Sequence, residues 1–584
     1  MTGMNSKSFM PKLTQNAVVV LKRRYLKKDI NGKVIETPAK MFQRVARNIA
    51  SAETIYDSKA DRFLWEKTYY DLMARLEFLP NSPTLMNAGR ESQQLSACFV
   101  LPVEDSLESI FEAVKHTALI HQSGGGTGFS FSRLRPKNDR VLSTSGIASG
   151  PISFMKVFNI ATEVIKQGGT RRGANMAVLK VDHPDILEFI KVKENPSELT
   201  NFNISVGLTE EFMEAVERNT TYPLINPRNQ EAVRTLRART VFNRIVGAAW
   251  KSGEPGILFL DRINRDQPTP KLGEIEATNP CGEQPLLPYE SCNLGSINLT
   301  KMVTEKEGHI VLDYGKLERT IKLAVRFLDN IIDLNCYPLP QIEAITKGNR
   351  KIGLGVMGWA DLLIQMGIPY GTPEALALAD DVMGFIQGKA RETSEVLAKE
   401  RGAFPNLPGS IFDRPGGKQF RNATVTTIAP TGTLSIIAGC SGGIEPLYGV
   451  SYLRTTLDGV QLIETHPTFL ELARHKKFYS RDLMKRLAKT ESIQDITTIP
   501  KEIRRLFVTA HDIPPEAHVR TQVAFQRHTD NAVSKTVNFP AGATTGQVQK
   551  AFLLAYREGL KGITIYRSGS RDQQVLTCAN IQYC

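Results

Sequence analysis

A shaped loop in the middle of the chain constrains its fold and chemistry more than any other stretch. In the run A-T-N-P-C-G-E, the residues Asn279, Cys281 and Glu283 stand at alternate positions, separated by a proline and a glycine. Proline fixes one backbone angle and glycine relaxes another, so the run predicts a loop of defined shape instead of a regular helix. In an extended loop, side chains at alternate positions point the same way. We therefore expect an amide, a thiol and a carboxylate to face one small volume, which indicates chemistry on a substrate that carries hydroxyls.

The cysteines indicate a reducing compartment. There are seven of them, an odd number that fits no secreted disulfide framework. Cys292 follows Cys281 within the same stretch, and Cys98 lies in a run from Leu95 to Pro102 that predicts a buried strand. A lone buried cysteine is usually a small hydrophobic residue. In a reducing compartment, any disulfide would be catalytic and transient.

The composition argues against a membrane protein and against a nucleic-acid-binding protein. The N-terminus has no apolar signal core, and no run of about 18 apolar residues could span a bilayer, so we expect a cytoplasmic protein. The formal net charge is +13, but no dense lysine and arginine tract carries it. A diffuse positive field suits nucleotides at least as well as a nucleic-acid polymer, and we expect no nucleic-acid partner. The nine histidines lack metal-ligand spacing, so no metal held by protein side chains is predicted.

Helical periodicity predicts a mostly helical region over residues 1 to about 85. The other predicted elements are helices from Ser106 to Gln122, Lys316 to Asn335, Pro373 to Arg401 and Thr544 to Glu558, and strands at 423–428 and 563–566. The run G-L-G-V-M-G at 353–358 has the form of a dinucleotide fingerprint, but polar residues precede it where a buried strand should stand. We interpret it as a glycine-rich turn that leads into a helix.

Three segments rich in glycine or hydroxyls are candidate ligand sites. S-G-G-G-T-G at 123–128 lets the backbone approach a ligand, although a helix C-cap with a turn explains the glycines equally well. Q-G-G-T-R-R-G-A-N-M at 167–176 places two arginines, which suit phosphate, among glycines; a solvated loop is the alternative. A-P-T-G-T-L-S at 429–435 follows a predicted strand and suits either a phosphate cradle or a plain capping turn.

Taken together, these motifs resemble those of ribonucleotide reductase catalytic subunits, most closely the adenosylcobalamin-dependent class II enzymes. The resemblance runs from about Arg23 to Asp572 and rests on N-P-C-G-E, L-S-A-C-F, Q-G-G-T-R-R-G-A-N-M and A-P-T-G-T-L-S. It implies an α/β fold: a ten-stranded α/β barrel of two parallel five-stranded halves arranged antiparallel, with a central finger loop and an N-terminal helical domain. The implied division is 1–85 for the helical domain, 86–572 for the barrel and 573–584 for a flexible redox tail, with no ATP-cone and no overall ATP/dATP control.

The resemblance also implies an activity, the reduction of ribonucleotides to 2′-deoxyribonucleotides by thiyl-radical chemistry. Adenosylcobalamin is the implied cofactor, and Cys281 is the implied radical residue. Asn279 would hydrogen-bond the sugar hydroxyls, and Glu283 would act as base toward the 3′-hydroxyl. Cys98 and Cys292 would form the redox pair that ends as a disulfide, while the cofactor supplies the radical step.

Two nucleotide sites follow from the same resemblance. The implied substrate-binding residues are Ser82, Ala97, Cys98, Gly125, Gly126, Asn279, Pro280, Cys281, Gly282, Glu283, Pro430, Thr431, Gly432, Thr433 and Leu434. The implied residues of the specificity site, where a dNTP or ATP effector selects the base, are Asp105, Ser106, Arg133, Lys137, Gln167, Arg171 and Arg172. A homodimer through the helices of the effector site is also implied.

Several alternatives remain at this stage. Class I subunits need a separate radical-generating subunit and use two adjacent tyrosines, whereas the corresponding run I-T-I-Y-R holds only Tyr566. A triphosphate-specific reductase is a second alternative, although the phosphate motif favours a ribonucleoside diphosphate. The tail cysteines Cys578 and Cys584 either re-reduce the active-site disulfide, with a thioredoxin- or glutaredoxin-type reductant, or are remnants of a shortened chain.

Overall fold

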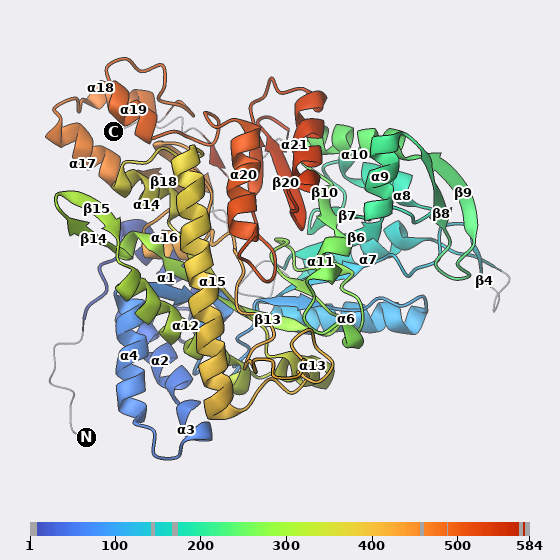
Figure 1. Cartoon of the computed structure of the whole chain (residues 1–584), viewed down its shortest axis with the longest axis horizontal. Helices are drawn as coiled ribbons and strands as arrows, with labels where there is room; N and C mark the ends of the chain where they lie inside the picture. Colours follow the sequence, from blue (N-terminus) through green and yellow to red (C-terminus); the bar gives the residue numbers. More distant parts are fainter. Residues whose placement is uncertain are drawn as a thin grey trace.

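Ten extended segments close into a barrel that is built from two halves (Figure 1). The computed structural model describes residues 9–141, 146–165, 173–455, 461–487, 489–570 and 576–577. Parallel strands form the first half: β2 (Cys98–Val100), β3 (Gly126–Ser130), β6 (Asn175–Lys180), β7 (Phe202–Leu208) and β10 (Gly256–Phe259). The second half consists of β13 (Ser291–Asn298), β16 (Ile352–Met357), the extended segment 424–428, β19 (Thr536–Phe539) and β20 (Gly562–Arg567).

Antiparallel pairing at two seams joins the halves. β2 pairs with β13 at one seam, and β10 pairs with β20 at the other. Within the second half, segment 424–428 links β16 to the residues just before β19. It makes parallel bridges from Thr426 to Leu354 and from Ile428 to Val533. The ring is therefore closed, and the predicted barrel of two antiparallel-arranged halves is confirmed. A short strand, β1 (Phe78–Pro80), leads from the N-terminal region onto β13.

The strand β16 corrects one sequence prediction. The prediction that the run G-L-G-V-M-G forms a turn is wrong. The run belongs to this buried strand, and only its last residue, Gly358, turns the chain into α14 (Trp359–Met366). A Cβ on Gly355 would lie 2.2 Å from the carbonyl oxygen of Thr427 in the next barrel segment. A glycine inside a strand often marks such a close backbone approach. The glycines therefore reflect tight packing between barrel strands.

Helices form the N-terminal region and cover the barrel. The N-terminal region folds into α1 (Gln15–Arg24), α2 (Pro38–Ala50), α3 (Glu53–Tyr56), α4 (Arg62–Ala74) and α5 (Ser82–Asn87), as predicted. The first half carries α6 (Leu107–Gln122), α7 (Pro151–Ile165), α8 (Ile186–Lys191), α9 (Glu210–Arg218), α10 (Ala238–Ser252) and α11 (Leu260–Arg265). The second half carries α12 (Tyr314–Leu334), α13 (Pro340–Asn349), α15 (Pro373–Arg401), α20 (Pro515–Gln526) and α21 (Thr545–Arg557). Ser106 caps α6, and Thr544 with Gln547 forms a capping box at the start of α21.

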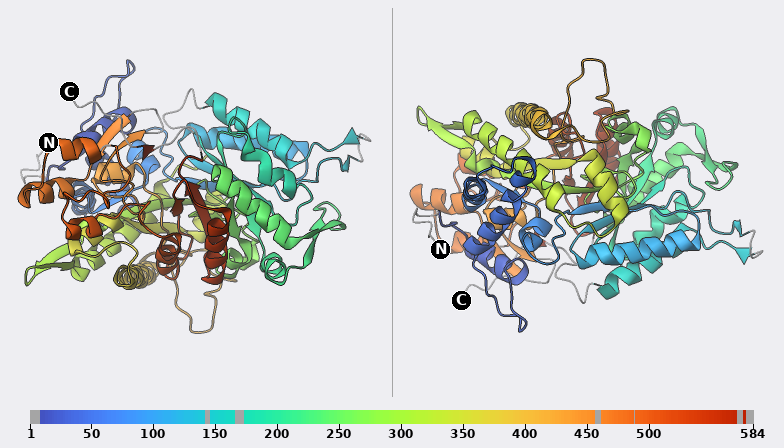
Figure 2. Two further views of the ribbon diagram at one scale, coloured as in Figure 1. Left: turned by 90° about the horizontal axis from the view of Figure 1, so that it is seen from above. Right: turned by 90° about the horizontal axis from the view of Figure 1, so that it is seen from below.

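Smaller elements surround this core, and α6 packs beside α7 on the outside of the first half (Figure 2). The outer strands are β4 (Arg140–Val141), β5 (Gly146–Ile147), β8 (Thr221–Ile225), β9 (Ala232–Arg237), β14 (Val303–Lys306), β15 (His309–Leu312), β17 (Ser451–Thr455), β18 (Gln461–Thr465) and β21 (Leu576–Thr577). The outer helices are α16 (Leu434–Ala438), α17 (Pro467–His475), α18 (Arg481–Leu487) and α19 (Lys501–Leu506). Within the described ranges, none of the helices has the length and apolar character needed to cross a membrane.

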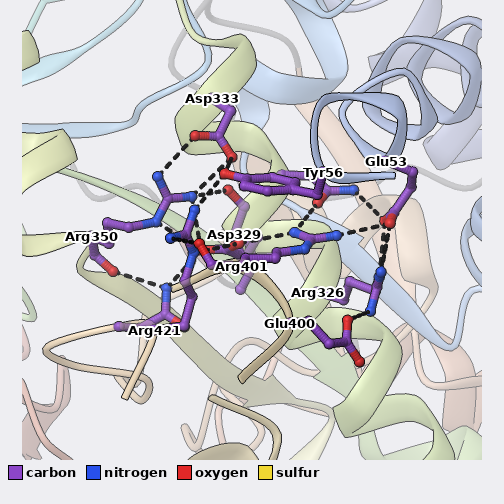
Figure 3. A network of polar contacts seen from close by, with 12 residues as sticks. Glu53, Tyr56, Arg326, Asp329, Asp333, Arg350, Glu400, Arg401 and Arg421 are labelled. Atoms are coloured by element: carbon purple, nitrogen blue, oxygen red, sulfur yellow. Dashed lines mark hydrogen bonds and ion pairs between the residues drawn. The ribbon is translucent and has the colours of Figure 1, made fainter. Parts of the chain in front are cut away.

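A buried network of charges fastens the N-terminal helices to the second half of the barrel (Figure 3). Asp329 of α12 binds Arg350 at 2.9 Å and Arg401 at 3.0 Å. Arg421 makes a third ion pair with this carboxylate at 3.3 Å, and Arg401 also binds Glu53 of α3 at 2.8 Å. Burial alone would raise the pKa of Asp329, but the three arginines lower it to about 2. The network therefore holds a charged carboxylate at the centre of the interface between α3, α12 and α15.

Candidate functional site

The shaped loop forms the tip of a hairpin that enters the barrel. Its arms, β11 (Ala277–Thr278) and β12 (Pro285–Leu286), pair antiparallel. The N–H of Gly282 donates to the carbonyl of Asn279 at 3.1 Å, and the side-chain Oδ1 of Asn279 accepts from the N–H of Gln284 at 2.9 Å. Gly282 has a φ of 82°, which favours glycine at this position. These bonds hold Cys281 at the exposed tip of the hairpin, which we call the finger hairpin (residues 277–286).

Glycines in β3 make the room that the finger hairpin needs. A Cβ on Gly128 would lie 1.8 Å from the carbonyl oxygen of Thr278, and a Cβ on Gly126 would lie 3.1 Å from the ring of Pro280. A side chain at position 128 would therefore displace the hairpin. The sequence predicted that the glycines at 123–128 let the backbone approach a ligand. At Gly126 and Gly128 the backbone instead approaches the finger hairpin.

Both halves of the barrel anchor the finger hairpin. Asn203 of β7 donates from Nδ2 to the carbonyl of Pro280 at 2.8 Å. On the other side, the carbonyl of Glu283 accepts from Thr427 Oγ1 at 2.9 Å and from the N–H of Ala532 at 3.0 Å. The sequence analysis missed all three anchors, because each comes from a barrel segment remote in sequence and belongs to no local motif.

Two buried cysteines face each other across the seam between β2 and β13. Cys98 and Cys292 are register partners, and they are 3% and 0% exposed. Both cysteines are reduced in the structure. Partners in an antiparallel pair have Cα atoms about 4.5–5.5 Å apart, which lies inside the range that a disulfide spans. Asn279 donates from Nδ2 to Sγ of Cys98 at 3.1 Å, so the finger hairpin reaches this pair directly.

The surroundings of Cys292 keep its thiol protonated. Burial is the main cause that raises its pKa well above the usual range for a thiol, and the nearby carboxylate of Glu290 adds to this effect. Lys351 opposes the shift and binds Glu290 at 2.7 Å, in an ion pair whose side chains are at most 1% exposed. At neutral pH the thiol of Cys292 is therefore protonated.

A cavity of about 510 Å³ lies against the finger hairpin near the β10–β20 seam. Pro280, Cys281 and Gly282 border it, together with residues of β6, β7, β10, β19 and β20. Its volume falls within the roughly 300–1,000 Å³ typical of ligand pockets. The finger hairpin thus touches the cysteine pair through Asn279 and the cavity through Cys281.

The predicted substrate-binding residues lie around the finger hairpin and the N-terminal helices. Ala97 packs against the barrel core that contains Ala429 and both buried cysteines, and Pro430 borders the cavity. The hydroxyl of Thr431 accepts from the N–H of Gly443 at 2.7 Å, just before α16. The hydroxyl of Ser82 pairs with that of Tyr25 at 2.8 Å, beside the packed helices α1 and α16. Tyr25 is a neighbour that the sequence analysis missed. The remaining predicted residues are Gly125, which precedes β3, and Gly432, Thr433 and Leu434, which enter α16.

Of the predicted effector residues that the structure describes, Asp105 and Ser106 lie at the start of α6, Arg133 contacts Glu104 beside it, and Lys137 contacts Glu188 of α8. Ser106 caps the helix, and the carboxylate of Asp105 binds Arg135 at 2.7 Å. Arg133 and Lys137 pair with neighbouring carboxylates. The other predicted effector and tail residues lie outside the described residues: Gln167, Arg171, Arg172, Cys578 and Cys584. Over the part of the chain that the structure describes, no three possible ligand side chains gather into a metal site.

A closed barrel entered by a cysteine-tipped hairpin, with a dithiol beside it, defines an oxidoreductase that works through cysteine thiols. The family model described as the ribonucleotide reductase barrel domain matches residues 96–566, and the model of the ribonucleotide reductase all-alpha domain matches residues 11–93. The chain belongs to the ribonucleotide reductase family.

Individual relatives agree with this assignment. The chain is 47% identical to the vitamin B12-dependent ribonucleoside-diphosphate reductase of Thermoplasma acidophilum, over 98% of this chain and 81% of the relative. It is 49% identical to the enzyme of the same description from Mycobacterium tuberculosis, over 97% of this chain and 81% of the relative. The solved class Id ribonucleotide reductase alpha subunit of Actinobacillus ureae has the same fold, with a TM-score of 0.77 at 22% identity over 95% of this chain and 97% of that chain.

Proposed function

We propose that this chain reduces ribonucleoside diphosphates to 2′-deoxyribonucleoside diphosphates with adenosylcobalamin as cofactor. The observation that carries the proposal is the finger hairpin, whose exposed tip residue Cys281 borders a ligand-sized cavity and whose Asn279 contacts Cys98 of the buried dithiol. The B12-dependent diphosphate reductases to which the chain is similar support the cofactor and the substrate class. We place the activity in the cytoplasm, where cysteines stay reduced between turnovers.

In this proposal each residue of the finger hairpin has a separate task. Cys281, once it has lost its hydrogen atom, abstracts the 3′-hydrogen of the ribose. Glu283 is 3% exposed and takes the proton of the 3′-hydroxyl, while Asn279 orients the sugar.

The buried dithiol supplies the electrons and the proton that the substrate needs. Cys98 and Cys292 give up two electrons and close a disulfide, and the 2′-hydroxyl leaves as water with a proton from one thiol. Cys292 is protonated at neutral pH, so its hydrogen is present in the reduced enzyme. The hydrogen of the other thiol goes to C2′, which ends as a methylene group. Cys281 then returns its hydrogen atom to C3′ and Glu283 returns its proton to the 3′-oxygen, so the oxidation of two thiols to a disulfide balances the two-electron reduction of C2′.

The cavity fits part of the proposed cofactor. Its wall combines apolar side chains such as Ile257 and Ile563 with buried polar groups, and it meets Cys281 on one side. Homolysis of the cobalt–carbon bond is the chemistry that bound adenosylcobalamin supplies there. The chain's own part is to hold that ligand next to the thiol and to exclude water from the site. Tyr566 of β20 also borders the cavity, without the second adjacent tyrosine that a class I radical route would use.

An anaerobic assay tests the proposed function. We expect dCDP from CDP only when adenosylcobalamin, dithiothreitol and a dATP effector are all present. Product from CTP instead of CDP would change the substrate class and keep the mechanism. Product that needs an added radical-generating subunit, and no cobalamin, would overturn the proposal.

We further propose a homodimer that forms through α6 and α7 and carries the effector site. Both helices expose apolar side chains: Leu107 and Phe111 on α6 are 61% and 54% exposed, and Ile160 and Val164 on α7 are 63% and 66% exposed. Large apolar side chains gathered on two packed surface helices are typical of a protein interface. The start of α6, with Asp105 and its partner Arg135, lies beside this surface.

Charging this surface should separate the dimer. We expect the double variant Phe111→Glu, Ile160→Glu to sediment as a monomer and to lose the effect of dNTPs on base selection, because a buried unpaired carboxylate strongly opposes association. Phe63→Glu is the matched control, since Phe63 on α4 is also exposed, at 73%. Analytical ultracentrifugation measures the result, and a double variant that remains dimeric would contradict the proposed interface.

We propose that the tail cysteines re-reduce the disulfide between Cys98 and Cys292 by thiol exchange and then pass the oxidation to a thioredoxin- or glutaredoxin-type protein. Replacing Cys578 and Cys584 by serine should abolish turnover with thioredoxin and leave turnover with dithiothreitol within about twofold, because a small dithiol reaches the barrel without the tail. Steady-state rates with the two reductants give the answer. A variant that loses neither activity would show that the tail is no shuttle.

A further inference from the structure

A buried ion pair stands beside Cys292. Glu290 precedes this cysteine by two residues, and side chains two apart in an extended chain point to the same face. Asn293, the next residue, is the register partner of Ile352 in β16. Cys292 and Lys351 stand one position earlier on the two strands, so they are neighbours. Sγ of Cys292 accordingly donates to the carbonyl of Lys351 at 3.5 Å.

Hydrogen bonds fix the carboxylate of Glu290. Its Oε2 accepts from Nζ of Lys351 at 2.7 Å and from the N–H of Leu287 at 2.9 Å. Its Oε1 accepts from Nδ2 of Asn349 at 2.6 Å, and Asn349 in turn accepts from Asn406 at 2.8 Å. A carboxylate that accepts several hydrogen bonds stays ionised even when it is buried. Glu290 is therefore a charged and fixed anchor for the lysine.

Stability is a poor explanation for this ion pair. Both side chains are at most 1% exposed, so both charges have lost their contact with water. Apolar side chains of similar volume often fill such a site at no cost, or even with a gain in stability. The position beside a redox thiol indicates a role in the chemistry of that thiol.

Lys351 acts on Cys292 in the opposite sense to the nearby carboxylates. Burial, Glu290 and Glu283 raise the pKa of Cys292, whereas Lys351 lowers it. A thiolate at this position is therefore strongly disfavoured, and the lysine offsets part of that cost. The reduced enzyme holds a protonated thiol here, so the lysine matters most in a step that produces the thiolate.

Opening a disulfide is such a step. When a dithiol attacks Sγ of Cys98, a new S–S bond forms there and the bond to Cys292 breaks. The electron pair of the broken bond stays on Sγ of Cys292, which then takes a proton from water. The second sulfur of the dithiol closes a ring disulfide and releases Cys98, which also takes a proton. The dithiol loses two electrons and two protons, and the protein disulfide gains the same number.

We propose that Lys351, held in place by Glu290, stabilises the Cys292 thiolate that leaves when the disulfide between Cys98 and Cys292 is opened. Cys98 contacts the neutral amide of Asn279, whereas the cation lies beside Cys292, so Cys292 is the better leaving sulfur. Glu290 is a positioning residue, because it acts through the lysine. The inference rests on the proposed function, in which the two cysteines close a disulfide.

Reduction of the oxidised protein by dithiothreitol tests the proposal without cofactor or substrate. Diamide closes the disulfide, and mass spectrometry of acid-quenched samples follows the opening of the Cys98–Cys292 link. We expect Lys351→Met to slow the opening by about tenfold, because the thiolate loses its cation and keeps the charge of Glu290 nearby. Glu290→Gln removes an opposing charge, so this variant should be no slower than the wild type.

The two variants separate charge from structure, because both break the same ion pair. Slowing in both variants, or a wild-type rate in Lys351→Met, would overturn the inference. Lys351→Arg keeps the cation and should stay within about threefold of the wild-type rate. The Tm of each variant checks its fold. Should Lys351→Met fail to fold, a Glu290→Gln protein slower than the wild type would contradict the inference by itself.

A second buried lysine provides the matched control. The side chain of Lys561 is 5% exposed and pairs with Asp266 at 3.2 Å, and it is not among the charges that shift the pKa of Cys292. Lys561→Met should therefore be reduced at the wild-type rate. A turnover of CDP without reductant that left Cys98 and Cys292 as thiols would overturn the proposed function. A disulfide that forms in turnover but opens at one rate in all variants would overturn this inference alone.

Discussion

Replacing Cys281 with serine is expected to lower kcat for deoxynucleotide formation by about 10⁴-fold or more, as for other enzymes that lose the residue on which the chemistry depends. The hydroxyl O–H bond is much stronger than the thiol S–H bond, so serine cannot yield a hydrogen atom and take it back in each turnover. The change is small and lies at an exposed turn position, so the finger hairpin should keep its shape. Product formation from CDP under anaerobic conditions measures the loss.

The same protein should still bind its ligands. Affinities for adenosylcobalamin and CDP should stay within about threefold of the wild type, because the thiol adds little to ground-state binding. Cys336→Ser is the matched control, since Cys336 is also exposed but lies outside the finger hairpin and the cavity lining, and it should keep full activity. If the Cys281→Ser enzyme kept a tenth of the wild-type activity, Cys281 would not be the radical residue.

Asp329→Asn is expected to produce the largest loss of stability. The carboxylate of Asp329 is fully buried and binds Arg350, Arg401 and Arg421 (Figure 3). An amide keeps the shape but removes the charge, which leaves buried guanidinium groups without their central counter-ion. We expect the free energy of unfolding to fall by about 3–5 kcal/mol, the usual cost of breaking a buried pair. Urea denaturation measures the change.

A surface carboxylate provides the comparison. Glu392 pairs with Lys389 and is 56% exposed, so Glu392→Gln should change stability by no more than about 1 kcal/mol. If Asp329→Asn and Glu392→Gln were equally stable, the buried network would not stabilise the interface between α3, α12 and α15.

The same carboxylate also sets a pH dependence. The folded pKa of Asp329, about 2, lies below the usual value of 3.8, so its contribution to stability is complete above about pH 4. That contribution is lost as the pH falls from about 4 toward 2, when the carboxylate takes up a proton. We expect wild-type stability to fall over this interval and the fall to be smaller in Asp329→Asn.

The finger hairpin shows what short runs of sequence can predict. Pro280 and Gly282 impose local backbone preferences, so the run around Cys281 predicts its own turn without any knowledge of the barrel. Helix ends behave in the same way, as Ser106 and Thr544 illustrate, since a cap depends on the next three residues. The sequence does not tell which apolar side chains of α6 are buried, since Leu107 and Phe111 on the apolar face of that helix are exposed.

The strand β16 shows where local rules fail. Its glycines resemble turn signals in sequence, but Gly355 is needed because the carbonyl of Thr427 lies too close for any side chain. That distance depends on the register of two barrel segments far apart in the chain, which a short window does not contain.

The sequence by itself determined the local parts of this protein: the shape of the finger tip, the residue types at the site, the long helices and, through its motifs, the family. Only the tertiary structure decided which of those parts meet. The register of β2 against β13 sets Cys98 opposite Cys292, Asn203 and Thr427 anchor the hairpin, and Lys535 and Glu445 meet in the cavity wall. The physical reason is that backbone preference acts over a few residues, whereas contact across a barrel depends on the simultaneous packing of segments from the whole chain.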